Sequence, residues 1–174
     1  MTEQAAESLA PGALAVLAST PAVFEALFAG QPKDALDRPG DEGWSPKDVL
    51  AHLISIQGPA LVDRVTAMLD SELPLLPDAD EHRLLEASGL RGRPERELLR
   101  MFSERRAQAM SLLERLRPED LRRRGRHELA GEVSVADVIH HMAYHDLLHI
   151  AQASDLLAEP IRRRRGAMGE AFPI

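Results

Sequence analysis

The sequence SVADVIHHMAYHDLLHIAQASDLLA spans residues 134–158 and decides the fold. Its apolar residues recur every three or four positions, a period that indicates an amphipathic α-helix. Ser134 and Asp137 form a capping box at its start, and Pro160 is expected to end it near Ala158. Four histidines fall inside this helix, so it carries candidate chemistry as well as core residues.

The same period recurs in three further stretches, and no stretch alternates convincingly between apolar and polar residues as a strand would. The first helix is expected to break where Thr20 caps a second segment that Pro21 opens. The second has its own capping box, Ser45 with Asp48, and Pro46 suits its first position. The chain is therefore expected to be all-α, with long helices over residues 8–30, 45–70, 94–118 and 134–158.

Two connections are longer than a tight turn. Residues 31–43 are expected to form a loop, and residues 71–93 are too long for a simple bundle turn, so they must cross the bundle or cover it. Residues 79–88 have the pattern of a short helix inside this crossover. A crossover of this kind would make the second and third helices parallel.

The composition is that of one soluble globular domain. The chain has 174 residues, of which 44% are hydrophobic and 28% charged, so a single domain over 1–174 is expected, with a core at 8–158 and a C-terminal tail at 159–174. No apolar run approaches the roughly 20 residues that span a membrane. The acidic N-terminus does not resemble a secretory signal, so a cytoplasmic location is expected.

The charge and the lack of cysteine exclude several classes of function. There is no cysteine, so any metal must be bound by His, Asp or Glu. The net charge of −7 argues against binding to nucleic acid. The arginine clusters at residues 122–126 and 162–165 lack interleaved aromatic residues, so we interpret both as solvated surface.

Seven histidines occur in the chain, and four share the last predicted helix. His145 and His149 lie four residues apart on one face, so both imidazoles can point at one ion about 2.0–2.1 Å from each nitrogen. His141 continues the stripe, but about 12 Å of helix axis separates it from His149. His140 points away from the stripe. One ion cannot reach all three residues of the stripe, so a third ligand must come from another helix.

His52 is the best candidate for that ligand. It lies on the expected core face of the second helix, where a polar group needs a partner. If the second and fourth helices are antiparallel, the start of the second helix lies beside the end of the fourth. His52 is about seven residues, or roughly 10 Å, beyond that start, and His149 is about nine residues before that end. The depths nearly match, so the sequence predicts a metal centre formed by His52, His145 and His149.

Plainer explanations stay open. A lone His52 is more often a hydrogen-bonded core histidine than a ligand, and two histidines four apart also occur by chance on exposed faces. His82 and His127 are expected in loops, as surface or loop-anchoring residues. No general acid or base can be named from the sequence, but four residues are candidates for contacts around the ligands: Arg64, His141, Asp146 and Gln152. Asp146 is interpreted first as an ion-pair partner of a neighbouring helix.

Two motifs, WSPKDVLAHL at residues 44–53 and HDLLHIAQ at residues 145–152, resemble the DinB/YfiT-like superfamily of metal-dependent enzymes. The likeness covers most of the chain and includes the Thr20-Pro21 segment, Arg64, Arg105 and the loop at 127–131. The resemblance implies a four-helix bundle with up-down-down-up connections and a homodimer. It also implies His52, His145 and His149 as the ligands of one divalent metal ion.

Three neutral imidazoles leave a coordination position open, as in catalytic metal sites. Zinc is expected first, while imidazole also suits nickel, iron and copper, and manganese is a further alternative. By resemblance, the leading expectation is an enzyme that transfers a low-molecular-weight thiol, such as bacillithiol or mycothiol, to electrophiles, with this thiol as cosubstrate. A metal-dependent hydrolase or isomerase, a non-enzymatic metal- or ligand-binding protein, and a purely structural bundle are the alternatives.

Overall fold

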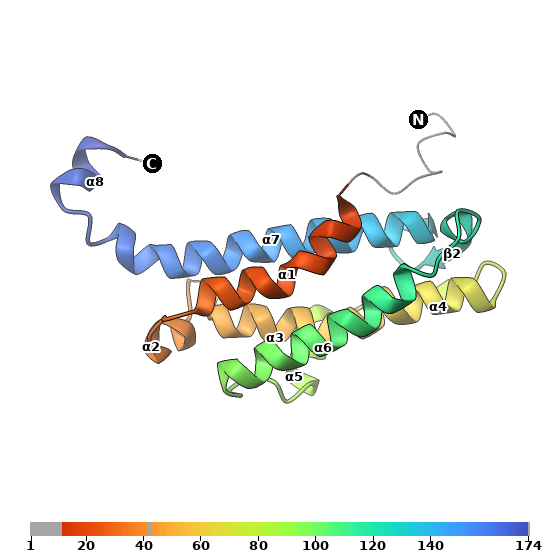
Figure 1. Cartoon of the computed structure of the whole chain (residues 1–174), viewed down its shortest axis with the longest axis horizontal. Coiled ribbons are helices and arrows are strands. Elements are labelled where there is room, and N and C mark those ends of the chain that lie inside the picture. The colour runs from red at the N-terminus through yellow and green to blue at the C-terminus, as the bar shows by residue number, and fades with distance from the viewer. Residues whose placement is uncertain (1–11, 42, 174) are drawn as a thin grey trace.

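The computed structural model describes residues 12–41 and 43–173, and its long helices form a four-helix bundle (Figure 1). Figure 1 shows α1 and α7 running in one direction along the bundle, and α3–α4 and α6 running in the other. This is the predicted up-down-down-up order. The first long segment is α1 (Ala13–Phe28), and the second consists of α3 (Pro46–Gln57) and α4 (Asp63–Asp70), joined by a π turn (Gly58–Val62). The third and fourth are α6 (Glu95–Leu113) and α7 (Val135–Arg162). The short helices are α2 (Lys33–Asp37), α5 (Glu81–Ala87), a 3₁₀ turn (Asp120–Arg122) and α8 (Ala167–Ala171).

Helix α1 is unbroken, so the predicted break at Thr20 is wrong. The Thr20 hydroxyl donates to the carbonyl of Val16 at 2.8 Å instead of capping a new segment. Pro21 lies inside the helix, and because it has no N–H it cannot bond the carbonyl of Leu17. The guanidinium of Arg106 donates to that carbonyl at 2.7 Å, which satisfies the group that Pro21 leaves unpaired. The predicted start of this helix at residues 8–11 lies outside the described residues.

The second predicted helix reaches Asp70 as expected, but it contains a π turn that the sequence pattern did not predict. Pro59 lies in that turn. In a regular α-helix its ring would clash with the carbonyl four residues earlier, and the wider π turn relieves this clash.

Two other boundaries differ from the prediction. Helix α6 ends at Leu113, before Pro118, and α7 continues to Arg162 through Pro160. A proline in the last turn removes only one hydrogen bond, so it does not stop α7.

A small sheet at one end of the bundle corrects the expectation that the chain has no strands. Strand β1 (Leu75–Leu76) pairs in parallel with β2 (Arg124–His127), which pairs antiparallel with β3 (Gly131–Ser134). These strands are too short to show a period of two. Gly125 permits the close approach, since a Cβ there would lie 2.6 Å from Leu76 Cδ1. The short helix α2 within the predicted loop at 31–43 was also missed.

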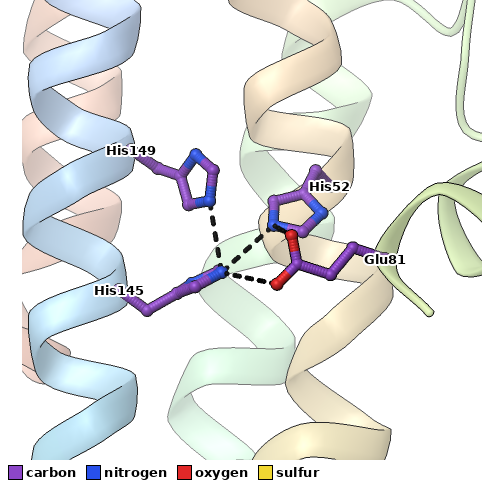
Figure 2. Close-up of side chains that lie close together, drawn as sticks. All are labelled: His52, Glu81, His145 and His149. Atoms are coloured by element: carbon purple, nitrogen blue, oxygen red, sulfur yellow. Dashed lines mark hydrogen bonds and ion pairs between the residues drawn. The ribbon is translucent and has the colours of Figure 1, made fainter. Parts of the chain in front are cut away.

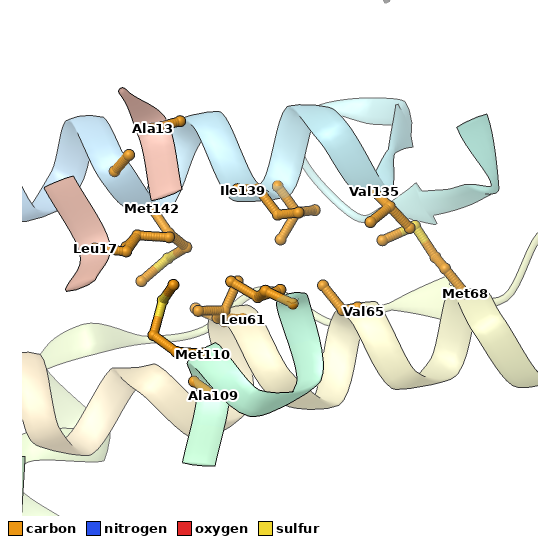
Figure 3. Packing of buried hydrophobic residues seen from close by; sticks show 14 of the residues in the cluster. Ala13, Leu17, Leu61, Val65, Met68, Ala109, Met110, Val135, Ile139 and Met142 are labelled. Carbon is orange, nitrogen blue, oxygen red and sulfur yellow. The ribbon is translucent and has the colours of Figure 1, made fainter. Parts of the chain in front are cut away.

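The core consists of two apolar clusters separated by buried polar residues. One cluster fills the end near the sheet, where α1, α4, α6 and α7 meet (Figure 3). The other, which contains Phe24, Leu53 and Phe102, fills the opposite end. Each long helix contributes a buried polar residue between the two clusters: Thr20, Gln57, Arg106 and Asp146. Over the described residues, no helix is long and apolar enough to span a membrane.

Candidate metal centre

The two helices that carry the predicted ligands begin at the predicted capping boxes. The Ser45 hydroxyl accepts a hydrogen bond from the backbone N–H of Asp48 at 3.1 Å, and the Ser134 hydroxyl accepts one from Asp137 at 3.1 Å. Each cap fixes where its helix starts and therefore which face its histidines occupy. His52 lies in the second turn of α3, and His145 and His149 lie in the middle of α7.

The structure brings the three predicted histidines together between α3 and α7 (Figure 2). His145 Nε2 lies 3.3 Å from His52 Nε2 and 3.2 Å from His149 Nε2. Atoms bound about 2.0–2.1 Å from a tetrahedral ion lie roughly 3.3–3.4 Å apart. The nitrogens thus have the spacing of ligands to one ion.

Glu81, which the sequence did not single out, is the fourth member of the cluster. Its carboxylate Oε1 lies 3.4 Å from His145 Nε2, and its Oε2 lies 3.7 Å from His52 Nε2. One donor atom from each of the four side chains lies within 4.8 Å of every other. The side chain comes from the first turn of α5 and is 45% exposed, whereas His52 is fully buried.

Burial favours the neutral form of two imidazoles in the centre, those of His52 and His149. Removal from water lowers the pKa of His52 to about 3 and also lowers the pKa of His149, and the nearby imidazoles add to both effects. A hydrogen bond with His145 lowers the pKa of Glu81 to about 2. The neutral imidazoles of His52 and His149 and an ionised carboxylate therefore face one another, an arrangement that a cation between them would stabilise. The donor set fits a divalent metal ion.

The side chains around the ligands orient one histidine and border two recesses. Gln152 Oε1 accepts a hydrogen bond from His149 Nδ1 at 2.7 Å, which leaves Nε2 to face the centre. The Trp44 ring stacks on His149, with 6.3 Å between ring centroids and 13° between planes. An inner recess of about 410 Å³ is lined by Trp44, Glu81, His82, His149 and Gln152.

An outer recess of about 480 Å³ begins at Trp44 and Gln152, which it shares with the inner one. Its lining contains charges of both signs, contributed by Arg38, Asp41, Asp155, Glu159 and Arg163. The inner recess alone is lined by His149 and Glu81, so it is the one that reaches the cluster.

The remaining sequence candidates lie outside the cluster. The His141 ring is 6.2 Å from that of His145 and contributes no atom to the group. Asp146 forms the interhelical ion pair that was predicted, and its partner is Arg106, with Nη2 to Oδ1 at 3.1 Å. Arg64 donates to the carbonyl of Pro77 at 2.9 Å and so holds the segment that precedes α5.

The two histidines expected in loops lie in regular structure. His82 is exposed on α5, 5.6 Å from the Trp44 ring, and so borders the inner recess. His127 lies in β2, where its Nδ1 accepts from the backbone N–H groups of Leu129 and Ala130 at 3.2 and 3.3 Å. His127 therefore anchors the turn between β2 and β3.

Sequence reasoning missed Glu81 for an identifiable reason. The short helix at 79–88 was predicted, and Asp80 does cap it by accepting from the N–H of Arg83 at 3.0 Å. The long connection on either side, however, left its position relative to α3 and α7 undefined. Trp44 was recognised only as part of a motif, and its place beside His149 depends on the same unpredictable loop packing.

Comparisons with known proteins agree with this fold. A family model described as the DinB superfamily matches residues 17–153. A solved structure of YfiT from Bacillus subtilis, described as a probable metal-dependent hydrolase with an unusual four-helix bundle topology, superposes with a TM-score of 0.77 and 21% identity over 89% of this chain and 91% of that chain. No curated protein sequence matches the chain. Because the family model covers well over half of its length, the chain belongs to the DinB superfamily.

Proposed function

We propose that this protein is a metal-dependent hydrolase. The observation that supports it is the convergence of three imidazole nitrogens, with His145 Nε2 at 3.3 Å from His52 Nε2 and 3.2 Å from His149 Nε2, beside an ionised carboxylate. A divalent ion with three imidazole ligands would act as a Lewis acid and lower the pKa of water toward about 7.

The residues of the chain supply the other elements of a hydrolytic reaction. Glu81 accepts a proton from water as the water oxygen forms a bond to the electrophilic atom of the substrate, and it returns that proton to the leaving group as the old bond breaks. Gln152 keeps His149 oriented through its hydrogen bond, and Trp44 covers one side of that ring. The inner recess provides the entry route for a small substrate.

The first experiment measures metal content in protein purified without an affinity tag. We expect about one ion per chain, lost in His52→Ala and in His149→Ala. His141→Ala is the matched control, because it removes a histidine from the same helix face that contributes no donor atom to the cluster. Full metal content in the first two variants would refute the metal centre.

The second experiment tests hydrolysis. The metal-loaded protein is incubated with a panel of chromogenic carboxylic and phosphoric esters, with the chelated protein and His149→Ala as blanks. We expect a metal-dependent rate that falls in Glu81→Gln. A panel without any metal-dependent hydrolysis above these blanks would argue against the hydrolase.

Transfer of a low-molecular-weight thiol is the second candidate, and the outer recess favours it. Arginine and carboxylate side chains line this recess, so it suits a small polar thiol with charges of both signs, and Gln152, which also lines it, bonds His149 of the cluster. We rank it second because a thiolate would be repelled by Glu81, whereas water needs a base there. Metal-dependent conjugation of such a thiol to monochlorobimane, at a rate above that of ester hydrolysis, would reverse this ranking.

The homodimer, the zinc preference and a cytoplasmic location are also proposals. Imidazole ligation supports zinc first and nickel or iron next. Size-exclusion chromatography with light scattering would show whether the chain is dimeric.

A further inference from the structure

Helix α5 places Glu81 at the metal centre through a firmly anchored backbone. One turn beyond Glu81, Leu85 is 1% exposed and packs in the apolar cluster with Phe24 and Phe102. On the other side, the preceding segment is held by the bond from Arg64 to the Pro77 carbonyl at 2.9 Å, and by the bond from the Asp78 N–H to the Glu128 carboxylate at 2.8 Å. The fold therefore fixes where the Glu81 side chain begins.

The Glu81 carboxylate reaches the spacing of a ligand. Figure 2 shows it pointing from α5 toward His52 and His145, and each oxygen approaches a different imidazole, at 3.4 and 3.7 Å. A carboxylate oxygen binds zinc at about 2.0–2.2 Å, so oxygen and nitrogen ligands of one tetrahedral ion lie roughly 3.3–3.5 Å apart. The separation of Oε1 from His145 Nε2 falls in this range, and the separation of Oε2 from His52 Nε2 lies slightly above it.

Charge supports the same conclusion. Three neutral imidazoles leave both charges of a divalent ion uncompensated beside His52, which is fully buried, and an uncompensated buried charge is costly. Within residues 12–41 and 43–173, the cluster contains one carboxylate, that of Glu81. The nearest acidic residue along α7, Asp146, is already paired with Arg106.

We propose that Glu81 is a fourth, displaceable metal ligand, which closes the centre until water or a substrate takes its place. The inference rests on the metal centre of the proposed function and deepens it. Glu81 is 45% exposed and borders the inner recess, so its carboxylate can leave the ion at little cost, whereas the side chains of His52 and His145 are 0% and 9% exposed. Once displaced, the carboxylate lies beside the fourth position, where it accepts the proton from water.

The test uses the protein loaded with Co²⁺, whose visible absorption reports the number and type of ligands. Glu81→Gln and Glu81→Ala are compared with Glu86→Gln, which changes an exposed residue on the same short helix. We expect both Glu81 variants to change the position and intensity of the absorption bands and to weaken Co²⁺ binding at least about tenfold. Glu86→Gln should match the unaltered protein in both respects. Bands and affinity that stay unchanged in both Glu81 variants would overturn the proposal.

A second measurement probes displacement directly. Azide is titrated into each Co²⁺-loaded protein, and we expect it to change the spectrum of Glu81→Ala at a concentration about tenfold or more below that needed for the unaltered protein, because no carboxylate competes. Equal azide affinities would also overturn the proposal. Loss of Co²⁺ in His52→Ala and His149→Ala shows that the metal centre itself exists, so a failure of the Glu81 proposal is distinguishable from a failure of the proposed function. Far-UV circular dichroism confirms that each variant is folded.

Discussion

Replacing Asp146 with Asn is expected to lower the free energy of unfolding by about 3–5 kcal/mol. Asp146 is fully buried and pairs with Arg106, whose side chain is 2% exposed. The guanidinium also donates to Gln57 Oε1 and to the Leu17 carbonyl, both at 2.7 Å, so it is held in place on three sides. Asn has nearly the volume of Asp but no charge. The variant therefore leaves a buried guanidinium uncompensated, and this accounts for the size of the loss.

Urea unfolding of the metal-free protein, followed by far-UV circular dichroism, measures this loss without a contribution from metal binding. For a chain of this length the same loss lowers the melting temperature by about 6–20 °C. The control is Glu104→Gln, which breaks the exposed pair of Arg100 with Glu104 and should change stability by no more than about 0.5 kcal/mol.

A loss below about 1 kcal/mol in Asp146→Asn would refute the reasoning. The double variant Arg106→Met with Asp146→Leu provides an independent check, because exchanging a whole buried ion pair for apolar residues is often neutral. We expect it to recover part of the stability that the single variant loses, because the Leu17 carbonyl and Gln57 Oε1 still lose their donor. A double variant as unstable as Asp146→Asn would mean that the bonds of Arg106 to Gln57 and Leu17, and not the ion pair, hold the four helices together.

Three further outcomes follow from the structure. Gln152→Leu removes the acceptor of the His149 Nδ1 hydrogen bond, which orients the His149 ring. The metal affinity, measured by competition with a chelating dye, should fall by about 10- to 100-fold. An unchanged affinity would contradict the orienting role of Gln152. The pKa of His52 is about 3 in the folded chain against 6.5 in the unfolded one, so the unfolded state binds more protons below pH 6.5. The stability of the metal-free protein should therefore be highest above pH 6.5 and fall as the pH drops toward 3. This fall should be shallower in His52→Gln. Ser134→Ala should cost about 1 kcal/mol because it removes the cap of α7, whereas Ser154→Ala, at an exposed position of the same helix, should change the urea midpoint little.

The bundle could be predicted because its long helices carry strong periodic patterns and clear start signals. Ser45 and Ser134 cap helices as predicted, and these starts set the faces on which His52, His145 and His149 converge. Geometry along one helix was enough to exclude His141, since axial distance within a helix depends only on sequence separation.

The features that sequence reasoning missed depend on contacts between distant parts of the chain. Pro21 predicts a break when α1 is considered alone, but Arg106, 85 positions later, satisfies the carbonyl that Pro21 leaves free. The two-residue strand β1 exists because β2 pairs with it, and no local pattern could show this. Glu81 reaches the centre only because of the way in which residues 71–94 pack against the bundle, and no sequence pattern determines that packing.

The π turn at Gly58–Val62 has a consequence for how this chain should be aligned with its relatives. His52 and Arg64 are 12 positions apart, which in a regular α-helix would place them about 120° from each other around the axis. One π turn absorbs an extra residue, so the two side chains come within about 20° of one face. His52 there meets His145, and Arg64 holds the segment before α5. The turn is thus equivalent to a one-residue insertion within a continuous helix. We expect relatives with a regular helix here to lack one residue between positions 58 and 62, and an alignment that places this gap in the following loop would rotate every later position of the helix by about 100°.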